Sequence, residues 1–161
     1  MTKRKNLNLP GSATEDEFHI AVAQLLDVCL IHPTFYTTFP AGYGKLSKAT
    51  SGRLRAKGMQ PGMPDILVFS RHTHETSRVI GLELKVKGNA LSSAQRFCHA
   101  RLQGVGVRVY VVRSLNDVIM SLSDAGIKYR NVHIPVGKTD VEPIRPGTVG
   151  GFGSVLGGTS G

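Results

Sequence analysis

The chain has 161 residues, enough for one compact domain with a buried core and too few for two ordinary domains. Hydrophobic residues make up 40% of it and charged residues 19%, which excludes a fully disordered chain and a membrane-spanning bundle. Twenty Lys and Arg against eleven Asp and Glu leave a net charge of +9, so nucleic acid is the first partner to expect.

Both ends of the chain are expected to lie outside the folded domain. Residues 1–11 are basic and end at Pro10-Gly11, which predicts a flexible arm. Residues 136–161 are rich in Gly and poor in large apolar groups, so they cannot offset their ordering entropy and predict a disordered tail. The folded domain is therefore expected over 12–135.

The cellular location follows from cysteine usage and from what the N-terminal stretch lacks. Two cysteines, Cys29 and Cys98, are too few for a disulfide framework, and both fall on apolar helical stripes as small core residues. The basic N-terminal residues run into Asn and Pro instead of an apolar segment. No run is long and apolar enough to cross a bilayer. We expect a cytoplasmic protein without a membrane partner.

Apolar periodicity and caps predict alternating helices and strands. In chain order we expect a helix over 15–30, a strand over 34–39, a basic helix over 47–57, strands over 65–69 and 79–86, a helix over 92–103, a strand over 107–112 and a helix from 114. The polar loop after residue 69 permits an antiparallel hairpin, and the helix over 92–103 suits a crossover to a parallel neighbour. Residues 127–135 fit a last strand or a loop. This order predicts an α/β domain with a mixed central sheet flanked by helices.

The helix over 92–103 is amphipathic. Its inward side is expected to carry Ala94, Phe97, Cys98 and Leu102.

The acidic residues are placed unusually. No acid lies between Asp27 and Asp65, and none lies between Glu83 and Asp117, although both stretches are rich in Lys and Arg. Asp65 and Glu83 are thus isolated carboxylates in a basic background, where they would repel a phosphate unless a divalent cation lay between them. Two carboxylates with carbonyl and water oxygens suit Mg²⁺ or Mn²⁺ better than zinc.

The spacing of the acids also predicts a site. Glu83 and Lys85 are two residues apart in a strand and project from one face. Asp65 opens the neighbouring strand after Pro61-Gly-Met-Pro64, so hairpin pairing would bring it close to Glu83. The Lys85 ammonium would then orient a water nucleophile and offset charge that grows on a phosphate.

The residues around Asp65 and Glu83 resemble the motif of a known family. Pro64-Asp65 followed by Glu83-Leu84-Lys85 is similar to the pattern of the PD-(D/E)xK nuclease superfamily, and the wider context resembles its VRR-NUC branch. That context consists of Gly44-Lys-Leu-Ser-Lys48, Leu54-x-x-x-Gly58, Gly62-Met-Pro-Asp65, Leu91-Ser92-x-x-Gln95 and Gly106-Val107-x-Val109. The resemblance covers about Thr14 to Leu122.

The resemblance implies a restriction-endonuclease-like core and hydrolysis of DNA phosphodiester bonds with Mg²⁺ or Mn²⁺. It implies metal ligation by Asp65 and Glu83, a catalytic role for Lys85, and supporting catalytic roles for Glu17 and Gln95. Small stand-alone members of the family resemble structure-specific endonucleases that dimerise and cut branched DNA such as Holliday junctions. A homodimer is therefore implied by likeness alone.

Several of these residues also have a purely structural explanation. Thr14-x-x-Glu17 and Ser92-x-x-Gln95 are both capping boxes, so a structural role stands beside the catalytic one for Glu17 and for Gln95. Glu83 and Lys85 alone would fit the solvated face of a strand. His99 lies one turn beyond Gln95, and the sequence favours a position outside the site over one within it.

The basic residues are assigned to DNA backbone contact, because cations without intervening acids repel one another unless a polyanion compensates. They are Lys45, Lys48, Arg53, Arg55, Lys57 and Lys87. Tyr36, Phe39 and Tyr43 are candidates for stacking on exposed bases, with a core role for Phe39 equally well supported. His72 and His74 lack a third ligand at zinc spacing and fit a hairpin tip better than a metal site.

Two alternative functions stay open. One is a non-catalytic basic protein that binds nucleic acid, and the other is an RNA-directed nuclease of the same architecture. The first predicts that EDTA and an Asp65 substitution leave its behaviour unchanged, and the second predicts cleavage of structured RNA.

Overall fold

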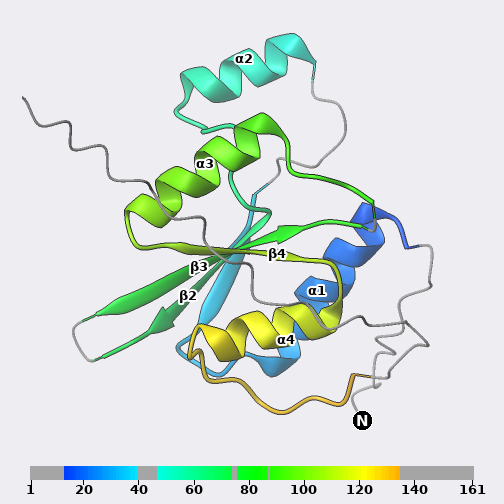
Figure 1. Cartoon of the computed structure of the whole chain (residues 1–161), viewed down its shortest axis with the longest axis vertical. Coiled ribbons are helices and arrows are strands. Elements are labelled where there is room, and N and C mark those ends of the chain that lie inside the picture. The colour runs from blue at the N-terminus through cyan, green and yellow to red at the C-terminus, as the bar shows by residue number, and fades with distance from the viewer. Residues whose placement is uncertain (1–12, 40–46, 74–75, 87, 135–161) are drawn as a thin grey trace, which may run out of the picture.

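The computed structural model of the chain describes residues 13–39, 47–73, 76–86 and 88–134 (Figure 1). The expected arm over 1–11, the turn at 40–44, Lys45, Lys87, the loop residue His74 and the tail over 136–161 lie outside the described residues. The elements are α1 (Glu15–Cys29), β1 (Phe35–Thr38), α2 (Lys48–Ala56), β2 (Ile66–Arg71), β3 (Ser77–Leu84), α3 (Ser93–Gly104), β4 (Arg108–Val112) and α4 (Leu115–Asp124).

The four strands form one mixed sheet in the order β1-β2-β3-β4. β1 pairs antiparallel with β2, and β2 pairs antiparallel with β3, as the predicted hairpin requires. β3 pairs parallel with β4 after the crossover through α3. The predicted α/β architecture with a mixed sheet and flanking helices is confirmed, and it is consistent with a restriction-endonuclease-like core.

The helices are divided between the two faces of the sheet. In Figure 1, α1 and α4 lie together on one side, and α3 lies on the other side with α2 beyond it. The strand residues under α1 and α4 form the core face, which consists of Ile66, Val68, Ile80, Leu82, Leu84, Tyr110 and Val112. The alternate residues form the α3 face, which consists of Phe35, Thr37, Leu67, Phe69, Arg71, Val79, Gly81, Glu83, Val109 and Val111.

The core face is closed by apolar packing. Val22, Leu25 and Leu26 of α1 and Val118 and Leu122 of α4 are all fully buried against it. Burial of a Leu or Val side chain contributes about 1.5–3 kcal/mol, so this layer supplies much of the stability of the domain. The start of α1 is fixed by the predicted cap, because the Thr14 hydroxyl accepts a hydrogen bond from the Glu17 backbone N–H.

The predicted inward side of α3 is wrong in part. Phe97 is 67% exposed and Ala94 is exposed, whereas Cys98 and His99 are buried. The helix is rotated relative to the apolar stripe because the polar side chains of Gln95 and His99 both have a partner on the sheet. Periodicity weighs apolar side chains only, so it does not detect such a long-range polar contact.

Smaller expectations have mixed outcomes. Cys29 and Cys98 are free and buried, as predicted. Tyr36 packs against the core and donates its hydroxyl hydrogen to Asp27 Oδ1 at 2.8 Å, so the expectation that it stacks on bases is wrong. Residues 127–134 form a loop in which Tyr129 makes one isolated bridge with Leu30. None of the helices in the described ranges is long and apolar enough to span a membrane.

Candidate active site

Asp65 and Glu83 lie together where the β2–β3 hairpin meets the N-terminus of α3. Asp65 directly precedes Ile66, whose partner on β3 is Leu82, so Glu83 follows next to Asp65 in the antiparallel register. The backbone N–H of Leu84 donates to Asp65 Oδ2 at 2.8 Å. This hydrogen bond ties the Asp65 carboxylate to the strand that carries Glu83, as the predicted hairpin requires.

The segment before Asp65 is held by close packing. Gly62 has a φ of +80°, and a Cβ at this position would collide with the backbone of Ala94 in the first turn of α3. A Cβ on Gly81 would lie 2.7 Å from Cγ of Pro64, which is buried over β3. Both glycines are therefore needed for the approach of this loop to α3 and the sheet, and the loop in turn fixes Asp65.

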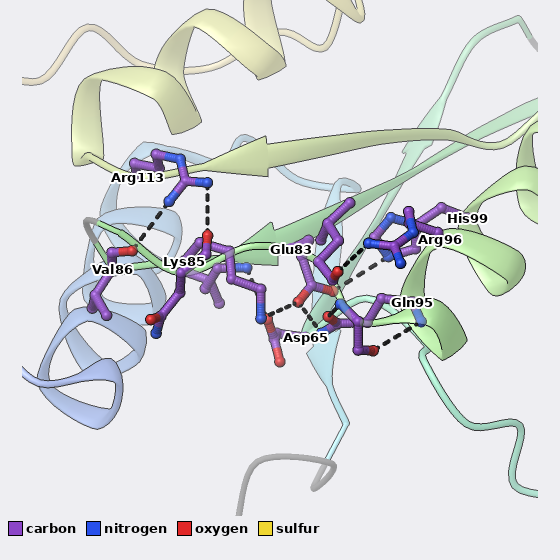
Figure 2. Close-up of polar contacts among 12 residues, drawn as sticks. Asp65, Glu83, Lys85, Val86, Gln95, Arg96, His99 and Arg113 are labelled. Atoms are coloured by element: carbon purple, nitrogen blue, oxygen red, sulfur yellow. Dashed lines mark hydrogen bonds and ion pairs between the residues drawn. The ribbon is translucent and has the colours of Figure 1, made fainter.

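Glu83 is fully buried and surrounded by polar side chains (Figure 2). Its Oε1 atom accepts a hydrogen bond from Gln95 Nε2 and lies 3.0 Å from Lys85 Nζ. Lys85 itself is buried. A buried carboxylate and a buried ammonium are costly to desolvate, so a structural salt bridge alone is a weak reason to keep them. The pair has the burial and charge of a functional site.

Gln95 closes the cap of α3 and also contacts Glu83 in the candidate site. Its Oε1 atom accepts a hydrogen bond from the Ser92 backbone N–H at 2.8 Å and so closes the capping box of α3. Its Nε2 atom donates to Glu83. One side chain thus caps the helix and fixes the position of the carboxylate.

His99 reaches the site, although the sequence argument favoured the opposite. Its Nε2 atom lies 3.3 Å from Glu83 Oε2, without the geometry of a hydrogen bond, and both atoms are buried without a hydrogen-bond partner among the described residues. Burial lowers the pKa of His99, with Asp65 acting against it and Lys85 in the same direction, so the neutral form of the ring is favoured. Glu83 Oε2 is therefore a buried carboxylate oxygen that lacks a cationic neighbour on this side.

The surroundings of Glu83 raise the pKa of its carboxyl group. Burial first and the charge of Asp65 second raise the pKa of Glu83 to about 7, against the opposing effect of Lys85. A buried carboxylate with a raised pKa beside a second carboxylate is an arrangement that a divalent cation stabilises.

Asp65 and Glu83 would supply part of the ligand set of such a cation. Among the described residues no group of three or more His, Cys, Asp and Glu side chains is arranged to hold a metal ion. Mg²⁺ keeps several waters and is commonly held by one or two carboxylates together with substrate phosphates, so a pair of carboxylates suffices. Asp65 and Glu83, with an unpartnered oxygen on the latter, fit that pattern.

Lys85 is positioned by the sheet and by Arg113. Strand β3 ends at Leu84, two residues earlier than expected, yet the Lys85 backbone N–H still donates to Val112 O at 3.0 Å. The Arg113 guanidinium donates to Val86 O at 3.1 Å and to Asn89 O at 2.9 Å (Figure 2). The chain just beyond Lys85 is thereby held at its backbone.

Glu17, the predicted supporting acid of α1, contacts Thr14 in the cap of its own helix. Glu17 is exposed, and its Oε2 accepts hydrogen bonds from the backbone and hydroxyl of Thr14, which lower its pKa. The acid of α1 whose charge contributes to the raised pKa of Glu83 is Glu15, which the sequence argument did not single out. Helical geometry separates the two side chains by about 200°, so one cannot simply replace the other.

Part of the predicted basic surface is visible. Arg53 and Arg55 of α2 and Lys57 just beyond it are exposed, as binding to a DNA backbone requires. The two arginines also lie in the last turn of α2, where cations stabilise the helix dipole. Lys48 begins α2, but its side chain is outside the described set, as are Lys45 and Lys87.

Comparison with known proteins supports the family suggested by the motifs. The model of the VRR-NUC domain matches residues 45–116, a range that contains the Pro-Asp segment, the β2–β3 hairpin, α3 and β4. Neither the curated proteins nor the solved structures give a significant match. Asp65, Glu83, Lys85 and Gln95 all fall within the matched range. Residues 45–116 therefore match the VRR-NUC domain, and the VRR-NUC family belongs to the PD-(D/E)xK nuclease superfamily.

Proposed function

We propose that the chain is a DNA endonuclease that depends on Mg²⁺ or Mn²⁺ and acts on branched DNA such as Holliday junctions. The VRR-NUC domain indicates a nuclease. The observation that carries the finer proposal is the buried Glu83 carboxylate, which lies beside Asp65 and 3.0 Å from the Lys85 ammonium. A non-catalytic DNA-binding surface gives no reason to bury the Glu83 carboxylate and the Lys85 ammonium together.

Asp65 and Glu83 would hold the metal ion. When bound, the cation would supply Lewis-acid stabilisation of the negative charge that develops on the scissile phosphate. The substrate phosphate and water would complete its oxygen shell, because no group of three or more ligating side chains is found there among the described residues. Gln95 is a positioning residue in this scheme, since its hydrogen bond fixes the Glu83 side chain.

Lys85 would act on the nucleophile. Its ammonium is held 3.0 Å from Glu83 Oε1, so it can orient a water for in-line attack at phosphorus and offset charge in the transition state. The exposed cations Arg53, Arg55 and Lys57 would bind phosphates away from the cut. The homodimer implied by the resemblance and the cytoplasmic location expected from cysteine usage stay predictions.

The direct experiment is a cleavage panel with four-way junction, flapped duplex, linear duplex, single-stranded DNA and structured RNA. Wild type is expected to cut branched DNA with Mg²⁺ or Mn²⁺ and to stop when EDTA is added. Asp65→Asn and Lys85→Ala should each lose at least about 100-fold in rate, the typical cost of removing an electrostatic contact in the transition state. Full activity of Asp65→Asn would rule out the mechanism, and preferential cutting of RNA would change the substrate.

Two matched variants of α1 separate the neighbouring acids. Glu15→Gln removes the charge that acts on Glu83, whereas Glu17→Gln keeps a side chain that can close the capping box. We expect Glu15→Gln to lower the cleavage rate more than Glu17→Gln does. The reverse order would support the catalytic role that the resemblance implies for Glu17.

A further inference from the structure

The two oxygens of the buried Glu83 carboxylate have different surroundings. Oε1 accepts a hydrogen bond from Gln95 Nε2 and lies 3.0 Å from Lys85 Nζ. Oε2 is also buried, but it has no hydrogen-bond partner among the described residues. A carboxylate oxygen that is removed from water without a partner is costly. Oε2 is therefore a candidate to bind a group that the chain itself does not supply.

His99 of α3 places a second buried atom of this kind beside Glu83 (Figure 2). Its Nε2 atom lies 3.3 Å from Glu83 Oε2 and likewise has no hydrogen-bond partner among the described residues. The His99 side chain is 8% exposed and that of Glu83 is 0% exposed. In the part of the chain that the structure describes, these are the two buried side-chain nitrogen and oxygen atoms without a partner, and they are neighbours.

The contact between the two atoms has the spacing of two ligands of one metal ion. Ligands that each lie about 2.1 Å from an ion are about 3.0 Å apart at an octahedral angle and about 3.4 Å apart at a tetrahedral angle. Such ligands point at the ion and not at each other, so a close pair of them does not have the geometry of a hydrogen bond. Glu83 Oε2 and His99 Nε2 have both properties, since they lie 3.3 Å apart without that geometry.

The charges around the pair also suit a cation. The Lys85 ammonium lies beside Oε1, and no Lys or Arg among the described residues forms an ion pair with Oε2. Asp65 acts electrostatically on both Glu83 and His99, so a second carboxylate charge is near the pair. No third His, Cys, Asp or Glu of the described ranges is arranged with the pair to hold an ion, so water and a substrate phosphate would supply the other ligands.

We propose that His99 is a metal ligand that acts together with Glu83, through Nε2 of the histidine and Oε2 of the glutamate. This inference rests on the proposed function and goes beyond it, because an imidazole ligand changes which ion the site prefers. Mg²⁺ takes oxygen ligands, whereas imidazole nitrogen suits first-row transition metals. His99 would therefore make the site favour a transition-metal ion such as Mn²⁺ over Mg²⁺.

Pulsed electron paramagnetic resonance of bound Mn²⁺ tests this assignment, because a coordinated imidazole nitrogen modulates the signal of the ion. Spectra are recorded for wild type, His99→Gln and His133→Gln, with less Mn²⁺ than protein. His133→Gln is the matched control, since it removes an exposed histidine from the loop after α4. His99→Phe keeps a ring without a ligand nitrogen and is the second variant should His99→Gln fail to fold.

The expected result is nitrogen modulation in wild type and in His133→Gln that is lost in His99→Gln. Calorimetry should show Mn²⁺ binding weakened by at least about 10-fold in His99→Gln, because even the loss of a group that only supports a ligand costs about 10- to 100-fold in metal affinity. Mg²⁺ binding should change little, since a water can replace the imidazole on that ion.

The other outcomes separate this inference from the nuclease proposal. Mn²⁺ bound to wild type without nitrogen modulation would overturn the ligand role of His99, even where branched DNA is cut, and so would an absence of Mn²⁺ binding. Equal losses of Mn²⁺ and Mg²⁺ affinity in folded His99→Gln would overturn the ion preference and indicate a structural role. Nitrogen modulation that depends on His99, without metal-dependent cleavage of any nucleic acid, would uphold the ligand and overturn the nuclease proposal.

Discussion

The two faces of the sheet are built from the same strands, yet they differ in what they bury. The core face meets α1 and α4 with aliphatic side chains that are almost entirely inaccessible. The α3 face buries a carboxylate at one end and leaves a phenylalanine exposed at the other. The core face stabilises the domain, and the candidate active site lies on the face whose packing is incomplete. Substitutions on either face, or in the helices and loops packed against it, should therefore have different effects on stability.

The largest effect on stability is expected on the core face. Leu82→Ala removes a fully buried side chain beneath α1 and α4 and should lower the free energy of unfolding by about 2–5 kcal/mol. Phe97→Ala, on the exposed side of α3, removes a larger side chain whose neighbour is the Arg101 guanidinium, 5.9 Å from the ring centre. Its cost should stay below about 1 kcal/mol. Urea denaturation measures both, and similar costs would contradict the assignment of the core.

An intermediate effect is expected where the loop before Asp65 approaches α3. Gly62→Ala forces an L-residue into a positive φ and a Cβ into the Ala94 backbone, so it should cost about 1–3 kcal/mol. Gly52→Ala is a control inside α2, where an added Cβ meets nothing within 4 Å. That change should leave stability equal or raise it by up to about 1 kcal/mol. A Gly62→Ala protein as stable as wild type would show that the loop is not fixed by this contact.

The last expected effect is a pH dependence that comes from the α3 face. The pKa of Glu83 is raised from 4.5 to about 7, so the folded metal-free chain holds this proton more tightly than the unfolded chain. The contribution of Glu83 to stability is thus fully present below pH 4.5 and is lost as the pH rises to about 7. The lowered pKa of His99 acts in the opposite direction.

The measurement is urea denaturation in EDTA at several pH values, for wild type and for Glu83→Gln. The difference between the two proteins reports Glu83 together with its coupling to His99, because the two side chains are 3.3 Å apart. Wild type should lose stability relative to Glu83→Gln between pH 4.5 and 7. A difference that does not vary with pH would show that Glu83 is not desolvated in the folded chain.

Local signals in the sequence were sufficient for most of the fold. The cap at Thr14, the hairpin and the helical crossover between β3 and β4 all follow from periodicity and turn chemistry, which act over a few residues. The pairing of Asp65 with Glu83 was predictable for the same reason, since a hairpin fixes its own register.

The parts that could not be predicted depend on contacts between distant elements. The rotation of α3 follows from the contacts of Gln95 and His99 with Glu83, which lies on a different element. The contribution of the Glu15 charge to the raised pKa of Glu83 depends on how α1 is oriented over the sheet. Neither contact has a signal in the spacing of apolar residues along one helix.

The central claim is that Asp65 and Glu83 together bind a divalent cation, and calorimetric titration with Mn²⁺ tests it most directly. Wild type is expected to bind the ion, and Asp65→Asn and Glu83→Gln are each expected to lose that binding while the far-UV spectrum stays unchanged. Mn²⁺ uptake by both variants at the wild-type affinity, or none by wild type even with DNA present, would contradict the account.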